Sequence, residues 1–382
     1  MADTPESTDA PASDAPAASS RSADPARSPA ALLGVIALIL VVGIGGFLYS
    51  KSQLPQPDEE RDKALLGFGD PVENTLNERY TDADGDLVAD APTSADAMLD
   101  PDVVYFSYLH GGVSNVDASV FQTVLLPALE QATGKRFAYL KDLDNEQAQL
   151  VALRDGELHV TAVNTGAVPL AVNEAGFVPL ATPGDETGPN QYKSVIIAPA
   201  ASGVSTLEDL RGKTLVVTRP NSNSGYKAPV LMLMDKNMSP VGQRDFEIVY
   251  SYGHEESIAR VKSGNCDAAA VASDLLAAKV AAGEIAEADF RVVAESAPFP
   301  PITFGVSHRL NPEVTAKVTE ALMGLSLGDG SPLSSQIAGG ASGMTPVVYK
   351  DAFAAVRQID NRFGQKHALP EADEAEPAAQ GG

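Results

Sequence analysis

The residues best suited to binding chemistry form a short polar loop, Pro220–Tyr226, with the sequence PNSNSGY. It follows an apolar run of strand length and opens a helical pattern. Hydroxyl groups, an amide and free backbone N–H groups at a helix start can bind an anion without any formal positive charge. A structural helix cap needs only one such side chain. The loop therefore predicts an anion site, with a plain cap as the alternative.

Two more polar residues stand where a predicted strand passes into a helix. His254 lies in the segment YGHEESI, and it either donates a hydrogen bond to an oxyanion or caps a surface helix. Asp274 begins the next helix and has the same two alternatives, a cap or a ligand contact. No second histidine follows His254 at the spacing of a zincin, which excludes that metal site.

Four carboxylates upstream are spaced as in some cation-binding loops. Asp82, Asp84, Asp86 and Asp90 occupy relative positions 1, 3, 5 and 9, and oxygen ligands of this kind suit a hard cation. Gly85 is at position 4 instead of the EF-hand's 6, and the pattern resembles the Asp-x-Asp-Gly-Asp loops of thrombospondin-type calcium repeats. Those repeats occur in tandem, and this chain has one copy. A calcium loop and a solvated acidic linker both stay open.

The familiar catalytic signatures are missing from the sequence. It has no Gly-x-Ser-x-Gly elbow and no phosphate loop of the Gly-x4-Gly-Lys-Ser/Thr type. The five histidines are scattered without metal-ligand spacing, and the single Cys266 excludes a disulfide scaffold. We therefore expect no enzyme and no required cofactor.

Apolar spacing predicts the elements that position these loops. Strands are expected at about 103–109, 137–140, 158–163, 214–218, 247–250, 268–271 and 290–293, and helices at about 117–133, 145–154, 167–174, 226–236, 254–262, 274–282, 312–325 and 347–361. This alternation predicts an α/β fold of two lobes, each a mostly parallel sheet flanked by helices. Extended stretches near 192–198 and 301–307 predict two crossings between the lobes. Ligands of such sheets bind beyond the carboxyl ends of the strands, where the polar loops lie.

Four segments in this order resemble the phosphonate-type periplasmic substrate-binding proteins of ABC importers. They are Leu210–Thr218, Pro220–Tyr226, Gly253–Ile258 and Gly264–Val271, and the resemblance covers about residues 103–325. It implies the two-lobed type II periplasmic-binding-protein fold. It also implies capture of a small phosphorus oxyanion (phosphonate, phosphate or phosphite) outside the cytoplasm, for delivery to an ABC permease in the membrane.

The resemblance also assigns the ligand contacts. The loop that holds the phosphonate oxygens matches Ser222, Asn223 and Ser224, with Asn223 where threonine is usual, and continues through Gly225 and Tyr226. The family's histidine matches His254, and its amine-binding acid matches Asp274. Three more candidates line the first lobe: Tyr108, Asn164 and Thr165. The return segment 298–304 carries no second acid, so the identity of the oxyanion stays open.

The segment 30–49 is uncharged and apolar, and it is long enough to span a bilayer. We expect an uncleaved single-pass anchor, with a cleaved signal peptide or a buried helix as alternatives. No cysteine follows the run, which excludes a lipoprotein anchor. A short leading tail favours the bulk of the chain lying in the periplasm or extracytoplasmic space.

Charge and composition complete the predicted organisation. The net charge of −24 argues against nucleic acid as a partner. Much of the acidity lies between residues 58 and 102, which hold fourteen acids and three bases. The predicted parts are a disordered tail at 1–29, the anchor at 30–49, an acidic linker at 50–102, lobe 1 at 103–195 and 300–367, lobe 2 at 196–299, and a disordered acidic tail at 368–382.

Three functions are compatible with this organisation. The first is a membrane-tethered binding protein that serves an ABC permease. The second is a ligand sensor or scaffold of the same fold that signals to a membrane partner. The third is a biosynthetic enzyme of the same fold, which the missing nucleophile–base pair and the predicted membrane span disfavour.

Overall fold

The computed structural model describes residues 63, 66–109, 117–243, 245–328, 330–334, 337 and 341–371. The predicted tail 1–29 and the predicted anchor 30–49 lie outside the described residues, as does the end of the chain from 372. Within the described ranges, no helix has both the length and the apolar character needed to cross a membrane. The chain divides into the units 1–58 and 59–382, and both lobes belong to the second unit.

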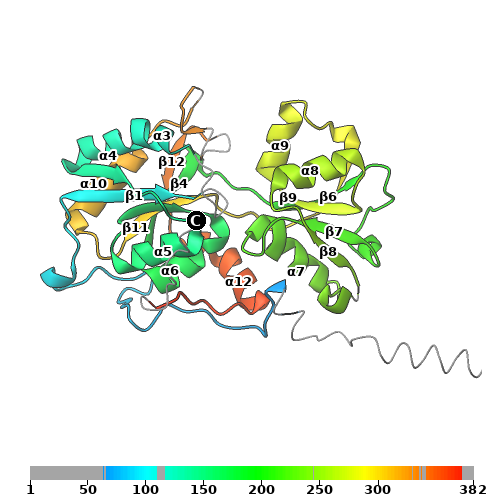
Figure 1. The fold of residues 1–382 in the computed structure, drawn as a ribbon, viewed down its shortest axis with the longest axis horizontal. Coiled ribbons are helices and arrows are strands. Elements are labelled where there is room, and N and C mark those ends of the chain that lie inside the picture. Colours follow the sequence, from blue (N-terminus) through cyan, green and yellow to red (C-terminus); the bar gives the residue numbers. More distant parts are fainter. Residues whose placement is uncertain are drawn as a thin grey trace, which may run out of the picture. The chain divides into compact units, whose positions relative to one another are not determined.

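The first lobe is built on a seven-stranded mixed sheet (Figure 1). Its order is β12-β4-β11-β3-β1-β2, with β5 beside β4. The strands are β1 (Val103–Tyr108), β2 (Arg136–Tyr139), β3 (Val160–Val163), β4 (Phe177–Asp185), β5 (Gly188–Pro189), β11 (Thr303–Ser307) and β12 (Gly343–Pro346).

Helices cover both faces of this sheet. One face carries α3 (Ala118–Val120), the π-helical turn η3 (Phe121–Leu125), α4 (Leu126–Thr133) and α10 (Pro312–Met323), and the other carries α5 (Glu146–Asp155) and α6 (Val168–Ala175). Asp117 caps the first helical run by accepting a hydrogen bond from Ser119 N–H, and Gly134 ends it at φ 72°. The apolar cores on the two faces centre on Phe106 and Leu153. The predicted helix 117–133 is thus confirmed.

The second lobe is built on a five-stranded sheet of order β10-β6-β9-β7-β8. Its strands are β6 (Ser194–Pro199), β7 (Thr214–Val217), β8 (Glu247–Tyr250), β9 (Ala268–Ala272) and β10 (Phe290–Glu295), and its helices are η6 (Asn223–Lys227), α7 (Ala228–Met234), α8 (His254–Ser263) and α9 (Ser273–Ala281). The helices α7 and α8 cover opposite faces, over cores that contain Val230 and Ile258.

Both sheets are mixed, which corrects the expectation of mostly parallel sheets. The pairs β1–β2, β1–β3, β7–β8 and β7–β9 are parallel, and the remaining pairs are antiparallel. The two return strands, β6 and β11, cause the antiparallel pairs β6–β9, β6–β10, β11–β3 and β11–β4. Each enters its sheet from the other lobe and therefore runs against its parallel neighbours.

The two crossings are shorter than predicted and pair with each other. Most of the ranges 192–198 and 301–307 belong to β6 and β11, within the sheets. Between the sheets, Tyr192 N–H donates to Phe299 O at 3.1 Å and Phe299 N–H donates to Tyr192 O at 2.8 Å. This antiparallel bridge joins the two connections into one ribbon.

Three strands (β4, β5 and β12) and one helix break were not anticipated. The strand β4 contains Pro179 and Pro183, and β12 ends at Pro346; proline weakens a strand pattern because it lacks a donor N–H. The expected helix 347–361 is split at Phe353 into α11 (Tyr349–Ala352) and α12 (Ala354–Phe363).

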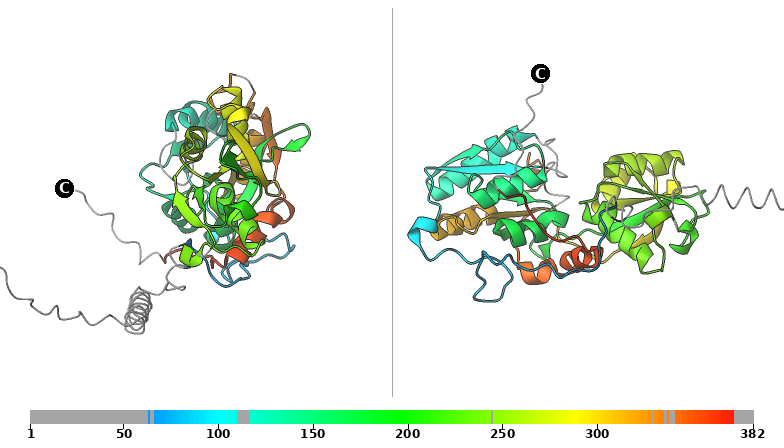
Figure 2. Two further views of the ribbon diagram at one scale, coloured as in Figure 1. Left: turned by 90° about the vertical axis from the view of Figure 1, so that its right-hand side faces the viewer. Right: turned by 60° about the horizontal axis from the view of Figure 1, so that its bottom comes forward.

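The predicted linker and C-terminal boundaries also change. Residues 66–102 lie on the body of the protein: Asn74 Nδ2 donates to Asn361 Oδ1 at 3.2 Å, and Leu99 N–H donates to Arg309 O at 2.6 Å. The helix α12 packs against both lobes, because Val356 belongs to an apolar core of the first lobe and Phe363 to an apolar core of the second. Residues 368–371 continue beside the first lobe (Figure 2).

Candidate functional site

The polar loop begins a helix, as expected, and Ser222 is its cap. The Ser222 hydroxyl accepts a hydrogen bond from Gly225 N–H at 3.0 Å, and the helix continues through η6 and α7. Glycine is required at 225, because a Cβ there would lie 2.0 Å from Thr218 Oγ1. Ser222 and Gly225 thus shape the loop and orient the two residues between them.

Asn223 and Ser224 are buried at the contact between the lobes, with 2% and 3% of their surface exposed. The Asn223 side chain has no hydrogen-bond partner for either polar atom among the described residues. Gly166 of the first lobe lies against this loop, since a Cβ on it would come within 2.6 Å of Asn221 O. A buried polar group without a partner costs about 1–3 kcal/mol. Such a group marks a place where a ligand or water supplies the missing bonds.

Three hydroxyl groups converge beside this loop from different parts of the fold. Burial raises the pKa of Tyr192 to about 12, while the neighbouring Thr165 and Ser224 hydroxyls act to lower it. Thr165 donates to Pro300 O at 2.8 Å and so is tied to the opposite crossing. The cluster unites lobe 1, lobe 2 and the ribbon between them. Sequence reasoning missed Tyr192, although a hydroxyl-bearing aromatic at the start of a crossing was a usable signal.

His254 begins α8, as predicted, and Asp274 is the second residue of α9. The His254 Nδ1 accepts a hydrogen bond from Ala272 N–H at 3.3 Å, which leaves Nε2 to carry the proton of a neutral ring. Asp274 accepts from Leu275 N–H at 2.8 Å, and desolvation raises the pKa of its carboxyl. The Asp274 charge also acts to raise the pKa of Tyr192, so this acid lies near the hydroxyl cluster.

The structure places Tyr226 and Tyr108 in cores, away from the role expected for them. The ring of Tyr226 is fully buried against Tyr250 and Phe363, and its hydroxyl donates to Leu66 O. Tyr108 is buried edge-on against Phe121 in the first lobe. Tyr226 ends a polar loop and Tyr108 precedes one in the sequence. Apolar packing against neighbours distant in sequence nevertheless decides where each ring lies.

Asn164 supports its own loop and a second contact between the lobes. Its amide donates to Leu109 O at 2.9 Å and to Glu146 Oε1 at 3.2 Å. The other oxygen of Glu146 accepts from Asn221 Nδ2 at 2.9 Å, which bridges lobe 1 to the polar loop of lobe 2. Burial raises the pKa of Glu146, against the lowering effect of these two amides and of Lys227. Nothing local in the sequence marked Glu146, because its partners come from two other segments.

A buried ion pair fixes the loop's helix to the C-terminal helix. Lys227 Nζ lies 2.6 Å from Asp360 Oδ1 and 3.5 Å from Gly166 O. His367 Nε2 lies 3.3 Å from the other Asp360 oxygen. Burial alone would raise the pKa of Asp360, but Lys227 and His367 hold it below its usual value. The pair therefore joins α12 to the first turn of the binding helix.

The acidic loop brings three of its four predicted metal ligands together. Carboxylate oxygens of Asp82, Asp84 and Asp86 all lie within 4.8 Å of one another. Asp90 instead accepts a hydrogen bond from Ala83 N–H at 2.9 Å and closes the loop. Desolvation and the neighbouring carboxylates raise the pKa of Asp86. The donor set of the three converging carboxylates fits a hard cation.

Two α/β lobes, joined by a paired ribbon and meeting at polar loops that follow strand ends, define a two-lobed periplasmic-binding-protein fold. The family comparison specifies the class further: the model for the ABC transporter phosphonate periplasmic substrate-binding protein matches residues 121–352. The chain belongs to this family of substrate-binding transport proteins, which implies an extracytoplasmic location.

Solved structures of low sequence identity share the fold. A binding-protein component of an ABC phosphonate transporter from Pseudomonas aeruginosa is 20% identical, with a TM-score of 0.53 over 68% of this chain and 86% of that one. PhnD1 from Prochlorococcus marinus, in complex with methylphosphonate, is 15% identical, with a TM-score of 0.54 over 70% of this chain and 100% of that one. A protein from Xanthomonas citri bound to ATP is 17% identical, with a TM-score of 0.55 over the same shares.

Proposed function

We propose that this protein binds a small phosphorus oxyanion between its lobes and presents it to an ABC permease. Asn223, Ser224, Thr165 and Tyr192 form the contact surface, with His254 and Asp274 beside it. The main observation that supports this proposal is the buried Asn223 amide, which has no hydrogen-bond partner for either polar atom among the described residues. A bound oxyanion accepts a hydrogen bond from its NH2 group, and a ligand hydroxyl or water donates to its oxygen.

The chemistry of this surface suits a phosphonate or phosphate group. Amide, hydroxyl and helix N-terminal N–H donors stabilise an anion through oriented dipoles, and their effect is stronger where water is excluded. An anionic ligand also lies near Asp274 and Glu146, whose pKa values are raised. Protonation of either acid on binding would remove its repulsion and add a donor. The methylphosphonate complex of the Prochlorococcus protein supports this ligand class.

We also propose that residues 30–49 anchor the chain in the membrane, with the two lobes outside the cytoplasm. The support is the uncharged apolar run, which is long enough to cross a bilayer. Tethering would keep the binding protein beside its permease. Alkaline carbonate extraction of membranes checks this, because an anchored chain stays in the pellet and a cleaved one does not.

The binding proposal predicts a thermal shift that depends on Ser224. Methylphosphonate or inorganic phosphate should raise the melting temperature of the wild-type protein, because a ligand that binds only the folded state stabilises it. Ser224→Ala should weaken binding by about ten- to a hundredfold, because it removes one hydrogen bond to a charged group and its contribution to the binding free energy. Ser263→Ala, an exposed serine at the end of α8, is the matched control. An equal shift in wild type and Ser224→Ala would refute the site.

For the acidic loop we propose a structural calcium ion held by Asp82, Asp84 and Asp86. Calorimetric titration of the full chain with calcium should give one site that Asp84→Asn weakens at least tenfold, because each lost carboxylate removes a charged ligand. Asp96→Asn, an exposed acid outside the loop, should leave the titration unchanged. Absence of heat at millimolar calcium would show that this segment is only a solvated acidic loop.

A further inference from the structure

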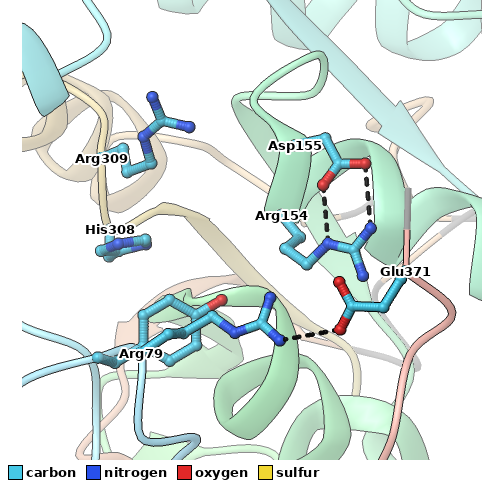
Figure 3. Close-up of a pocket in the computed structure, with 7 residues that line it drawn as sticks. Arg79, Arg154, Asp155, His308, Arg309 and Glu371 are labelled. Atoms are coloured by element: carbon cyan, nitrogen blue, oxygen red, sulfur yellow. Dashed lines mark hydrogen bonds and ion pairs between the residues drawn. The ribbon is translucent and has the colours of Figure 1, made fainter. Parts of the chain in front are cut away.

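A polar cavity lies in the first lobe where β11 and α5 end, away from the interlobe contact. The helix α5 runs from Glu146 at that contact to Arg154 at the cavity, a rise of about 12 Å. The cavity has a volume of about 420 Å³ and is lined by three arginines, two carboxylates, a histidine and a tyrosine (Figure 3). None of these residues belongs to the site proposed above.

The three arginines come from separate segments, and each is held by its own partner. Arg154 pairs side-on with Asp155, at 2.7 Å from Nε and 3.1 Å from Nη2. Arg79 Nε donates to Asn77 Oδ1 at 3.0 Å, and Arg309 Nε donates to Ala97 O at 3.0 Å. The Nη1 of Arg154 also donates to Pro370 O. These bonds fix the guanidinium groups in advance and leave the remaining N–H groups for a bound anion. A planar guanidinium so fixed suits two-point recognition of an oxyanion.

A carboxylate already occupies the space between two of these groups. The guanidinium groups of Arg79 and Arg154 both point toward Glu371 in Figure 3, and Arg79 Nη2 lies 3.6 Å from its Oε1. The Glu371 side chain is 73% exposed and that of Arg79 is 40% exposed. Exposed pairs at this distance contribute little, at most about 1 kcal/mol. The position of the Glu371 carboxylate therefore shows where an anion fits. Because its pairing with Arg79 is weak, an incoming anion displaces it easily.

His308 adds no charge to the cavity. Burial lowers its pKa to about 4, so the ring is neutral near pH 7. A hydrogen bond with the Gly176 backbone acts to raise that pKa, but burial outweighs it. Three arginines against two carboxylates leave one net positive charge, which becomes two when Glu371 moves away.

We propose that this cavity is a second anion site, which accepts a small doubly charged oxyanion such as inorganic phosphate. Arg79 and Arg154 donate hydrogen bonds directly to the anion, and Arg309 contributes positive charge from the adjoining wall of the cavity. Glu371 is the internal occupant that the anion must displace. Affinity at this site is therefore set by competition between the guest and a carboxylate of the same chain.

The test is calorimetric titration of the full chain with inorganic phosphate. Asn223→Leu and Ser224→Ala are present throughout, so that the interlobe site does not contribute. Adding Glu371→Gln should raise phosphate affinity about tenfold, since it removes the competing charge. Adding Arg79→Gln to that variant should lower it at least tenfold. Arg136→Gln, which removes an exposed charge on β2, is the matched control and should change affinity less than twofold.

Two outcomes would overturn the second site. One is the absence of phosphate binding in the Glu371→Gln variant. The other is binding that Arg79→Gln and Arg136→Gln weaken equally, which would show a general charge effect instead of a pocket. Melting curves of every variant accompany the titration, so that a loss through unfolding is recognised separately.

Discussion

Replacing Asn223 by leucine should make the unliganded protein more stable and abolish ligand binding. The Asn223 amide is buried at 2% exposure and has no partner among the described residues for either polar atom. An apolar side chain of similar size removes that desolvation penalty, so the free energy of unfolding should rise by about 1–2 kcal/mol. The ligand loses its central donor, and its affinity should fall at least a hundredfold.

This pair of opposite effects separates a binding residue from a structural one. Asn265→Leu, at an exposed position after α8, is the control and should change neither quantity by much. Urea denaturation measures stability, and calorimetry with methylphosphonate measures affinity. If Asn223→Leu destabilises the unliganded protein, the amide has a structural partner and the proposed site is wrong. Retained affinity would lead to the same conclusion.

Replacing Lys227 by methionine should cause the largest loss of stability. The Lys227 and Asp360 residues are 5% and 1% exposed, and their charged atoms lie 2.6 Å apart. Without Lys227, the buried Asp360 carboxylate loses its ammonium partner and keeps only His367 Nε2, at 3.3 Å. Breaking one partner of a buried ion pair costs about 3–5 kcal/mol. The double variant Lys227→Met with Asp360→Leu should recover most of that loss, because no buried charge is left unpaired.

The same pair predicts a pH dependence with a definite sign. The pKa of Asp360 in the folded protein is lowered from its usual 3.8. Its contribution to stability is therefore complete above pH 3.8 and is lost as the pH falls through the folded-state value. Wild type should lose this contribution on acidification, and the double variant should not. Urea midpoints measured on both sides of pH 3.8 check this, and parallel acid profiles of the two proteins would contradict it.

Much of the second lobe was predictable from local signals. The strands at 214–218 and 268–271 and the helices that follow each of them appear as expected, because apolar periodicity, caps and glycine stops act over neighbouring residues. The same signals located the starts of α8 and α9 to within one residue, but they placed the start of the helix in the polar loop at about Tyr226, where the structure begins it at Asn223. Antiparallel entry of β6 and β11 escaped prediction, because strand direction depends on which lobe the chain has just left.

The sequence by itself determined the position of the polar loop and the order of most elements, which follow from residue type and short-range spacing. It indicated the class of protein through the resemblance of four segments to a known family. Only the tertiary structure decided that Tyr226 faces a core, that Tyr192 joins Thr165 and Ser224, and that Glu146 bridges the lobes. It also brought Arg79, Arg154 and Glu371 together. These groups come from segments far apart in the chain, and their meeting depends on how the lobes and the segments alongside them pack.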